Sequence, residues 1–213
     1  MRTAVDFARH PGWFSSVVVR YRANRRVLAY ENYPLEFTGP LLAGPRRQTK
    51  PASSTWDDLR WLRKIWHGPL LVKGILTSRD ASMAVESGAD GIIVSNHGGR
   101  TLDSAVLPVD VLPEIVDAVG HQATVLADGG IRRGSDVTKL LALGAKAVLV
   151  GRAPLYGLAS AGEAGARRSL ELLVTELRRT MALAGVNSVS ELAADVLATS
   201  CNRGRRGWEQ HYD

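Results

Sequence analysis

The chain has 213 residues, of which 45% are hydrophobic and 23% charged, which suits one folded core and excludes a disordered chain. Its one cysteine, Cys201, excludes an intrachain disulfide framework, a cysteine-based metal site and a CxxC redox pair. The net charge of +6 gathers at the start, because residues 1–50 have nine Lys or Arg and three Asp or Glu, whereas residues 51–202 have fifteen and sixteen. No apolar run approaches the ~20 residues that span a bilayer, and no secretory signal is recognisable, so we expect a cytoplasmic protein.

The basic residues lie in an N-terminal arm and linker, residues 1–50. The segment WFSSVVVRYRANRR mixes aromatic residues, valines and four arginines, and three interpretations stay open: a short strand, a solvated loop, or a segment at a membrane surface. The stretch FTGPLLAGPRRQTKPASS is rich in Pro, Gly and Ser and is typical of a linker. Of the anionic partners that such an arm attracts, we expect nucleic acid less than a membrane.

From residue 51 onward, predicted helices alternate with short apolar strands. Thr55 and Asp58 have the spacing of a capping box, and so do Thr77 and Asp80, each at the start of a helix. Apolar strands between helices indicate parallel strands buried on both faces, as in a doubly wound sheet or a (β/α) barrel. No GxGxxG follows a strand, which disfavours a dinucleotide-binding sheet. The strands are LLVKGIL, GIIVS, TVLAD and AVLVG, and the later helices cover 108–119, 135–143 and 165–184.

Every predicted strand ends in polar or glycine-rich residues. The first ends at Lys73 and the second at Ser95, which NHGGR follows. The third runs into Asp128 and the fourth into Gly151. Active sites of (β/α) barrels are built at the carboxyl ends of the strands, so this regularity favours the barrel.

Two of these strand ends have the features of an anion site. The backbone at Gly129, Gly130 and Gly151 can approach a phosphate group closely, and the helix that follows adds its positive end. Arg132 and Arg152 add full charges. We therefore expect a phosphorylated ligand, with ordinary tight turns as the alternative.

Four separated motifs carry a family resemblance. LLVKGIL, GADGIIVSNHGGRTLD, VLADGGIRRGSDVTKLLALGAKAVLVGR and LYGL occur in order and resemble the FMN-dependent α-hydroxy-acid dehydrogenase/oxidase family, which includes glycolate oxidase, L-lactate dehydrogenase and (S)-mandelate dehydrogenase. The resemblance covers about residues 54–185. It implies a (β/α)8 TIM-barrel fold, of which residues 51–198 would form the C-terminal four βα units with terminal helices. It also implies FMN as cofactor, no metal, and oxidation of an L-2-hydroxy acid to the 2-oxo acid.

The resemblance also implies a role for each motif residue. His97 would be the catalytic base and would also contact the substrate, and Arg100 would bind the substrate carboxylate. Lys73 would stabilise negative charge at the N1/O2 edge of the flavin, and Ser95 would contact the flavin. The ribityl chain and phosphate would be held by Asp128, Gly129, Gly130, Ile131 and Arg132, together with Gly151 and Arg152.

These residue types suit the chemistry. Oxidising a 2-hydroxy acid removes two protons and two electrons, and an imidazole is a base that works near neutral pH. An arginine fork holds a carboxylate in two parallel hydrogen bonds. Gly98 and Gly99 leave room for a substrate against the flavin ring.

Part of the family's pattern has no matching position in this sequence. The first four strands supply an aspartate that orients the histidine and a second carboxylate-binding arginine. The alternative hypothesis is a catalytically inert half-barrel, which needs a complementary N-terminal half or a second copy, or serves as a binding or assembly module. The arm, residues 1–50, would correspond to the loop after the family's fourth strand and could touch the inner face of the membrane. Residues 199–213 would be a disordered tail.

Overall fold

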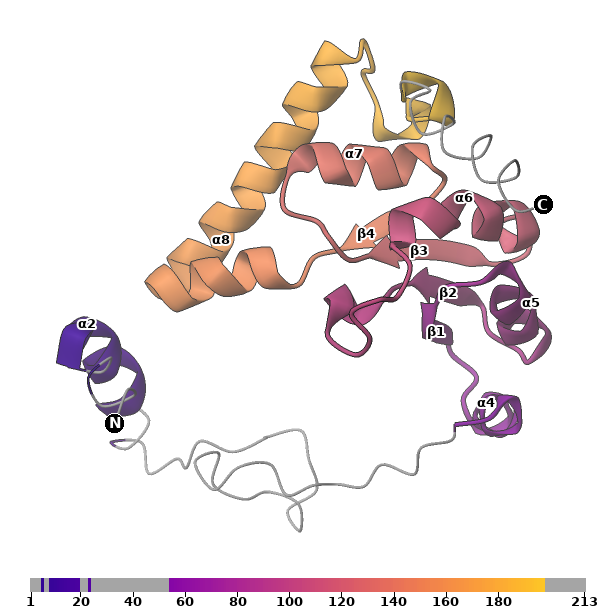
Figure 1. Cartoon of the computed structure of the whole chain (residues 1–213), viewed down its shortest axis with the longest axis horizontal. Coiled ribbons are helices and arrows are strands. Elements are labelled where there is room, and N and C mark those ends of the chain that lie inside the picture. Colours follow the sequence, from indigo (N-terminus) through magenta and orange to yellow (C-terminus); the bar gives the residue numbers. More distant parts are fainter. Residues whose placement is uncertain (1–4, 6–7, 20–22, 24–53, 198–213) are drawn as a thin grey trace, which may run out of the picture. The chain divides into compact units, whose positions relative to one another are not determined.

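The computed structural model describes residue 5, residues 8–19, residue 23 and residues 54–197 (Figure 1). The chain divides into two compact units, Met1–Ser53 and Ser54–Asp213. In the first unit, α2 (Pro11–Trp13) is continued by a π-helical segment, η1 (Phe14–Val19). For residues 13–19 of this segment, the short-strand interpretation is therefore wrong. The expected linker up to residue 53, the expected tail and Cys201 lie outside the described residues.

The second unit is built on a parallel sheet whose strands lie side by side in chain order. All four strands fall within the predicted apolar runs, and their carboxyl ends meet at one edge because all pairs are parallel. The strands are β1 (Leu71–Ile75), β2 (Gly91–Val94), β3 (Thr124–Asp128) and β4 (Ala147–Leu149).

The helices of this unit alternate with the strands, as predicted. The longer ones are α4 (Trp56–Ile65), α5 (Ser78–Glu86), α6 (Pro108–Val119), α7 (Gly134–Ala142) and α8 (Arg152–Leu183). The short 3-10 turns are η4 (His97–Gly99), η5 (Val189–Glu191) and η6 (Ala194–Val196).

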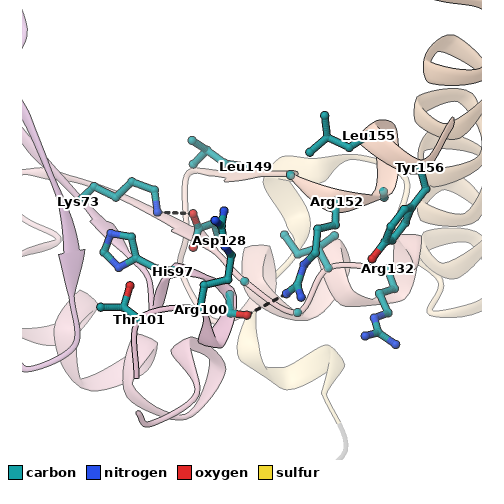
Figure 2. Close-up of a pocket in the computed structure, with 16 residues that line it drawn as sticks. Lys73, His97, Arg100, Thr101, Asp128, Arg132, Leu149, Arg152, Leu155 and Tyr156 are labelled. Carbon is teal, nitrogen blue, oxygen red and sulfur yellow. Dashed lines mark hydrogen bonds and ion pairs between the residues drawn. The ribbon is translucent and has the colours of Figure 1, made fainter. Parts of the chain in front are cut away.

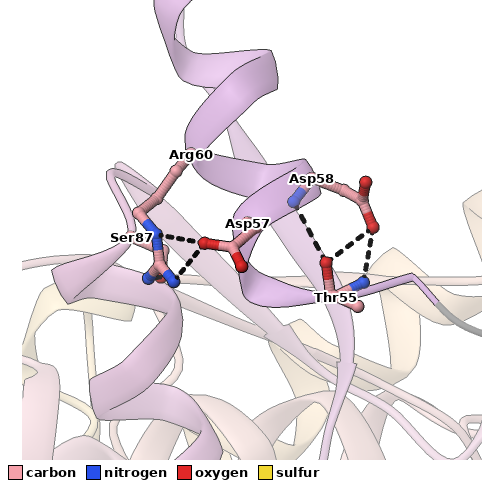
Figure 3. Close-up of polar contacts among 5 residues, drawn as sticks. All are labelled: Thr55, Asp57, Asp58, Arg60 and Ser87. Atoms are coloured by element: carbon pink, nitrogen blue, oxygen red, sulfur yellow. Dashed lines mark hydrogen bonds and ion pairs between the residues drawn. The ribbon is translucent and has the colours of Figure 1, made fainter.

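The start of α4 confirms the predicted capping box (Figure 3). The backbone N–H of Thr55 donates to Asp58 Oδ2 at 2.6 Å, and the N–H of Asp58 donates to Thr55 Oγ1 at 3.3 Å. The hydrogen bond from the Thr55 backbone lowers the pKa of the Asp58 carboxyl group. Arg60 then reaches Ser87 at the end of α5, with 3.1 Å from Nη1 to Oγ, which attaches α4 to the next helix.

The core lies between the sheet and its helices. On β3 the alternate residues Val125 and Ala127 are buried, and on α6 Leu112, Ile115 and Val119 are buried at helical spacing. These two periods, 2 and 3.6, place the apolar face of each element against the other. Burying each of the larger side chains contributes about 1.5–3 kcal/mol.

The predicted helix 165–184 corresponds to the second limb of α8, which ends at Leu183. The first limb, which starts at Arg152, was not predicted; the two limbs are separated at Ala161 and Gly162, whose backbone angles are not helical. Its two limbs touch at glycines, because a Cβ added to Gly157 would lie only 2.2 Å from the carbonyl oxygen of Gly165. Leu155, Tyr156 and Leu158 of the first limb are exposed, so this limb has no buried apolar stripe that would predict it from the sequence.

The inward face of α8 is confirmed in part. Leu173 and Met181 are buried as predicted, but Leu170 is 45% exposed. The reason is the position of α7. This helix begins at Gly134, which lies against the backbone of Leu177, so Leu170 precedes the contact by two turns.

Candidate functional site

A pocket of about 800 Å³ lies at the carboxyl ends of the strands (Figure 2). Each strand end contributes to its wall: Lys73 from β1, His97 after β2, Asp128 from β3 and Gly151 after β4. The fold therefore brings together residues that are spread over almost 80 positions of the sequence, roughly the Lys73–Arg152 interval. All the predicted site residues line this pocket except Ser95, which is completely buried.

Lys73 is held by two acceptors. Its Nζ lies 2.5 Å from Asp128 Oδ2, the ion pair drawn in Figure 2, and donates to Ser95 Oγ at 2.6 Å. The same Ser95 Oγ accepts the backbone N–H of His97 at 3.1 Å. One buried hydroxyl thus connects the cation at the end of β1 to the residue predicted as the base.

Asp128 has one carboxylate oxygen left for a ligand. Its Oδ1 is buried and has no hydrogen-bond partner among the described residues. A buried polar atom without a partner costs about 1–3 kcal/mol. A ligand hydroxyl that donates to this oxygen would remove the cost.

His97 lies in a turn with an unusual backbone. The φ angles of His97, Gly98 and Gly99 are 56°, 67° and 73°, and His97 is the only non-glycine residue with positive φ in the described part of the chain. The Asn96 side chain accepts the N–H of Gly98 at 3.0 Å and stabilises the turn. The imidazole packs on Gly74, where a Cβ would lie 2.8 Å from its Cε1 atom.

Gly74 has a geometric reason to be glycine. The register between β1 and β2 shifts between Lys73 and Ile75, which marks a bulge, and Gly74 has a φ of +100°. This bulge makes room for the His97 ring at the end of the neighbouring strand. Arg100 and Thr101 continue the turn along the pocket wall.

The opposite end of the pocket has open backbone and two arginines. A Cβ added to Gly130 or Gly151 would meet no atom within 4 Å, so these backbones can be approached by a ligand. Arg132 and Arg152 both line this end. Arg152 Nη2 also donates to the carbonyl oxygen of Gly98 at 3.0 Å, which links the two ends of the pocket.

The start of α7 is not available to an anion in the way the sequence predicted. The N–H groups of Arg132 and Arg133 both donate to Asp136 Oδ2 at 3.0 Å, and that of Gly134 donates to Glu176 Oε2 at 3.0 Å. Carboxylates of the chain itself therefore satisfy these donors. The first turn of α8 has no acidic residue and starts directly beside the pocket.

Sequence reasoning missed part of the apolar lining. Leu149, Leu155 and Tyr156 line the pocket but were not predicted for the site. The LYGL motif contains two of them, and its role becomes visible only because α8 starts at Arg152 and turns this segment toward the pocket.

The residues present fit FMN. Its phosphate group matches the end with open glycine backbone and two arginines, and a hydroxyl of its ribityl chain matches the free Asp128 Oδ1. Its ring can stack on a mixed wall with a cation, Lys73, nearby. The volume also lies in the range of about 300–1,000 Å³ that is usual for small-molecule sites.

Comparisons with known proteins point to the same cofactor. A family model described as FMN-dependent dehydrogenase matches residues 1–199. The L-lactate dehydrogenase of Pseudomonas paraeruginosa (strain DSM 24068 / PA7) is 53% identical over 145 residues, which are 68% of this chain and 38% of the relative. That of Caulobacter sp. (strain K31) is 46% identical over 203 residues, or 93% of this chain and 52% of the relative.

Solved structures of similar proteins agree. A monotopic membrane protein, (S)-mandelate dehydrogenase, has a TM-score of 0.72 at 46% identity, over 78% of this chain and 44% of that one. A soluble mutant of the membrane-associated (S)-mandelate dehydrogenase from Pseudomonas putida has a TM-score of 0.71 at 44% identity, over 84% and 53%. The expected fold class, that of the (β/α)8 barrel flavoenzymes, is confirmed.

The chain spans about two fifths to one half of the length of these relatives. Where the structure is described, no helix is both long enough and apolar enough to cross a bilayer. The family match extends over most of the sequence and includes every strand end that lines the pocket. This chain belongs to the FMN-dependent dehydrogenase family.

Proposed function

We propose that this chain takes part in the FMN-dependent oxidation of an L-2-hydroxy acid, such as lactate, mandelate or glycolate, to the 2-oxo acid. The observation that carries the proposal is the convergence of His97, Arg100 and Lys73 with an anion-binding end in one pocket. Similarity to an L-lactate dehydrogenase and to an (S)-mandelate dehydrogenase supports this substrate class.

In this proposal His97 and Arg100 contact the substrate directly. The imidazole of His97 removes a proton from the hydroxy acid, which a neutral ring can do near physiological pH. The guanidinium of Arg100, three residues along the same turn, pairs with the carboxylate and fixes which side of the substrate carbon faces the cofactor. The glycines between them keep the turn short enough for both side chains to reach one small molecule.

The remaining pocket residues hold and tune the cofactor. FMN, when bound, accepts the two electrons of the oxidation. Lys73, fixed by Ser95 and Asp128, places a positive charge where the ring becomes electron-rich. Asp128 Oδ1 accepts a hydrogen bond from a ribityl hydroxyl. The rest of the ribityl chain and the phosphate are bound by backbone and cationic groups of Gly129, Gly130, Ile131, Arg132, Gly151 and Arg152.

Anaerobic flavin reduction tests this function. The purified chain is loaded with FMN, freed of excess cofactor on a sizing column, and mixed with L-lactate, (S)-mandelate or glycolate. Loss of the visible flavin absorbance with one of these acids is the expected result. FMN that stays bound but is not bleached by any of them would support the alternative of an inert binding or assembly module.

Two histidine variants make the test specific. His97→Ala is expected to keep FMN and to lose bleaching by about 100-fold or more, the lower range for loss of a general base. His121→Ala is the matched control, since His121 is exposed and lies outside the pocket. Bleaching that survives in His97→Ala would refute the role of this residue as the base.

We also propose that the sheet works beside further strands. Among the described residues, β1 and β4 each have a neighbour on one side only. A second copy of this chain, or a complementary N-terminal half, could pair with both edges. Elution of the FMN complex at the mass of a monomer, with full activity, would contradict this partner.

A peripheral contact with the inner face of the membrane is proposed for the basic arm. Trp13, Phe14 and Val19 are exposed on the helical segment there, and the first 50 residues carry nine Lys or Arg. Sedimentation with anionic liposomes that weakens at high salt is expected. Equal sedimentation with neutral liposomes would contradict the electrostatic part of this contact.

A further inference from the structure

Arg152 reaches from one end of the pocket to the other (Figure 2). It is the first residue of α8, next to the Gly151 backbone at the proposed phosphate end. Its Nη2 donates to the carbonyl oxygen of Gly98, the residue after His97, at 3.0 Å. A residue assigned to the cofactor phosphate therefore also contacts the turn that carries the base.

That turn needs support from its surroundings. A positive φ costs a non-glycine residue about 1–2 kcal/mol, and His97 has a φ of 56°. The Ser95 hydroxyl and the Asn96 side chain fix the N–H groups of His97 and Gly98. The hydrogen bond from Arg152 fixes the Gly98 carbonyl, which neither of the others reaches.

Without a bound anion, forming the Arg152 hydrogen bond costs conformational entropy. The side chain is exposed, and immobilising an arginine side chain loses about 2 kcal/mol of rotamer entropy. A guanidinium has five N–H donors in one plane, so it can bind an anion while Nη2 keeps the Gly98 carbonyl. An anion that immobilises the group removes the entropic cost from the Gly98 hydrogen bond.

We propose that Arg152 is a positioning residue that couples anion binding at the Gly151 end of the pocket to the conformation of the His97–Gly99 turn. The inference rests on the proposed function, because the anion would be the phosphate group of FMN. The base is then held in its working position only when the phosphate site is filled. FMN organises both ends of the pocket, whereas riboflavin, which lacks the phosphate, fills only the ring end.

Arg132 provides a matched comparison. It lines the same end of the pocket and has the same charge. Within residues 54–197, no hydrogen bond joins its side chain to the His97–Gly99 turn. Arg132→Lys and Arg152→Lys each replace a fork by a point charge, but only the second removes the contact with Gly98.

Amide hydrogen exchange of the turn tests the coupling. The N–H groups of Gly99 and Arg100 donate within the turn, to Asn96 and His97 carbonyls, and report its opening. In the wild-type chain, saturating inorganic phosphate or FMN is expected to slow their exchange by about threefold to tenfold, up to the worth of one hydrogen bond to a charged group. Riboflavin alone should leave the rate of these amides unchanged, and riboflavin with inorganic phosphate should restore the slowing.

The variants decide the assignment. At phosphate concentrations that saturate each protein, Arg132→Lys is expected to show the wild-type slowing and Arg152→Lys to show none. Equal slowing in Arg152→Lys, or none in the wild type with phosphate bound, would overturn the coupling alone. A wild-type chain that binds neither FMN nor phosphate, measured by flavin fluorescence and by competition, would overturn the proposed function as well.

Discussion

Replacing Gly74 by alanine should displace the His97 ring although His97 itself is unchanged. Gly74 has a φ of +100°, and a Cβ at this position would lie 2.8 Å from His97 Cε1. Carbon atoms in contact prefer about 3.5–4.0 Å, so the ring must shift by roughly 1 Å. The backbone angle adds about 1–2 kcal/mol of destabilisation, because an L-residue is strained there.

Gly88→Ala separates the effect of backbone strain from that of the steric contact with His97. Gly88 has nearly the same φ, +101°, but its added Cβ would meet the side chain of Arg63, which is remote from the pocket. Both variants should lower the free energy of unfolding in urea by about 1–2 kcal/mol. Only Gly74→Ala should shift the NMR signal of the His97 Cε1 proton, which is identified by its absence in His97→Ala.

In the FMN-loaded protein, a displacement of about 1 Å at the base should lower kcat by about 100-fold. The Gly88→Ala protein should keep its kcat, after correction for any unfolded fraction. The reasoning would be refuted by an unchanged His97 signal in Gly74→Ala, or by an equal shift in Gly88→Ala, because the steric contact would then not determine the ring position.

Three further substitutions test other parts of the structure. Gly134→Ala should destabilise the chain by about 3 kcal/mol in urea, since its Cβ would lie 2.0 Å from the backbone nitrogen of Leu177 and force α7 away from α8; a loss below about 1 kcal/mol would contradict this contact. Ser95→Ala should cost about 0.5–1.5 kcal/mol, because the part-buried N–H of His97 loses its acceptor; an unchanged urea midpoint would show that another group replaces the hydroxyl. Asp90→Asn should flatten the acid branch of the stability curve. Hydrogen bonds from a backbone N–H and an arginine hold the pKa of Asp90 below its usual 3.8, so its stabilisation is present above that pH and is lost as the pH falls through the lowered value; urea midpoints at about pH 5 and about pH 3 should differ less in the variant than in the wild type.

The order of helices and strands follows from local patterns. The strand TVLAD and the helix 108–119 occupy their predicted positions, because apolar period and breaker residues act within a few positions of the chain. The capping box at Thr55 is equally local, since its two hydrogen bonds join residues three apart. The position of each site residue at a strand end also follows, because every strand runs in the same direction.

The sequence did not predict which side chains would occupy the backbone N–H groups at the start of α7. It indicated a free helix start after Arg132, but Glu176 from α8 and Asp136 already satisfy those N–H groups. It predicted the second limb of α8 near residue 165 but not the first limb, which approaches the second closely at Gly157 and Gly165.

By itself, the sequence determined the family, the parallel βα order and the polar and glycine residues at the strand ends that line the pocket, because motif identity and periodicity are properties of nearby residues. The tertiary structure alone decided that Ser95 joins Lys73 to His97 and that Arg152 joins the two ends of the pocket. These contacts connect residues up to 54 positions apart in the sequence. Their distances depend on how the strands align and where α8 begins, and neither is encoded in any single segment.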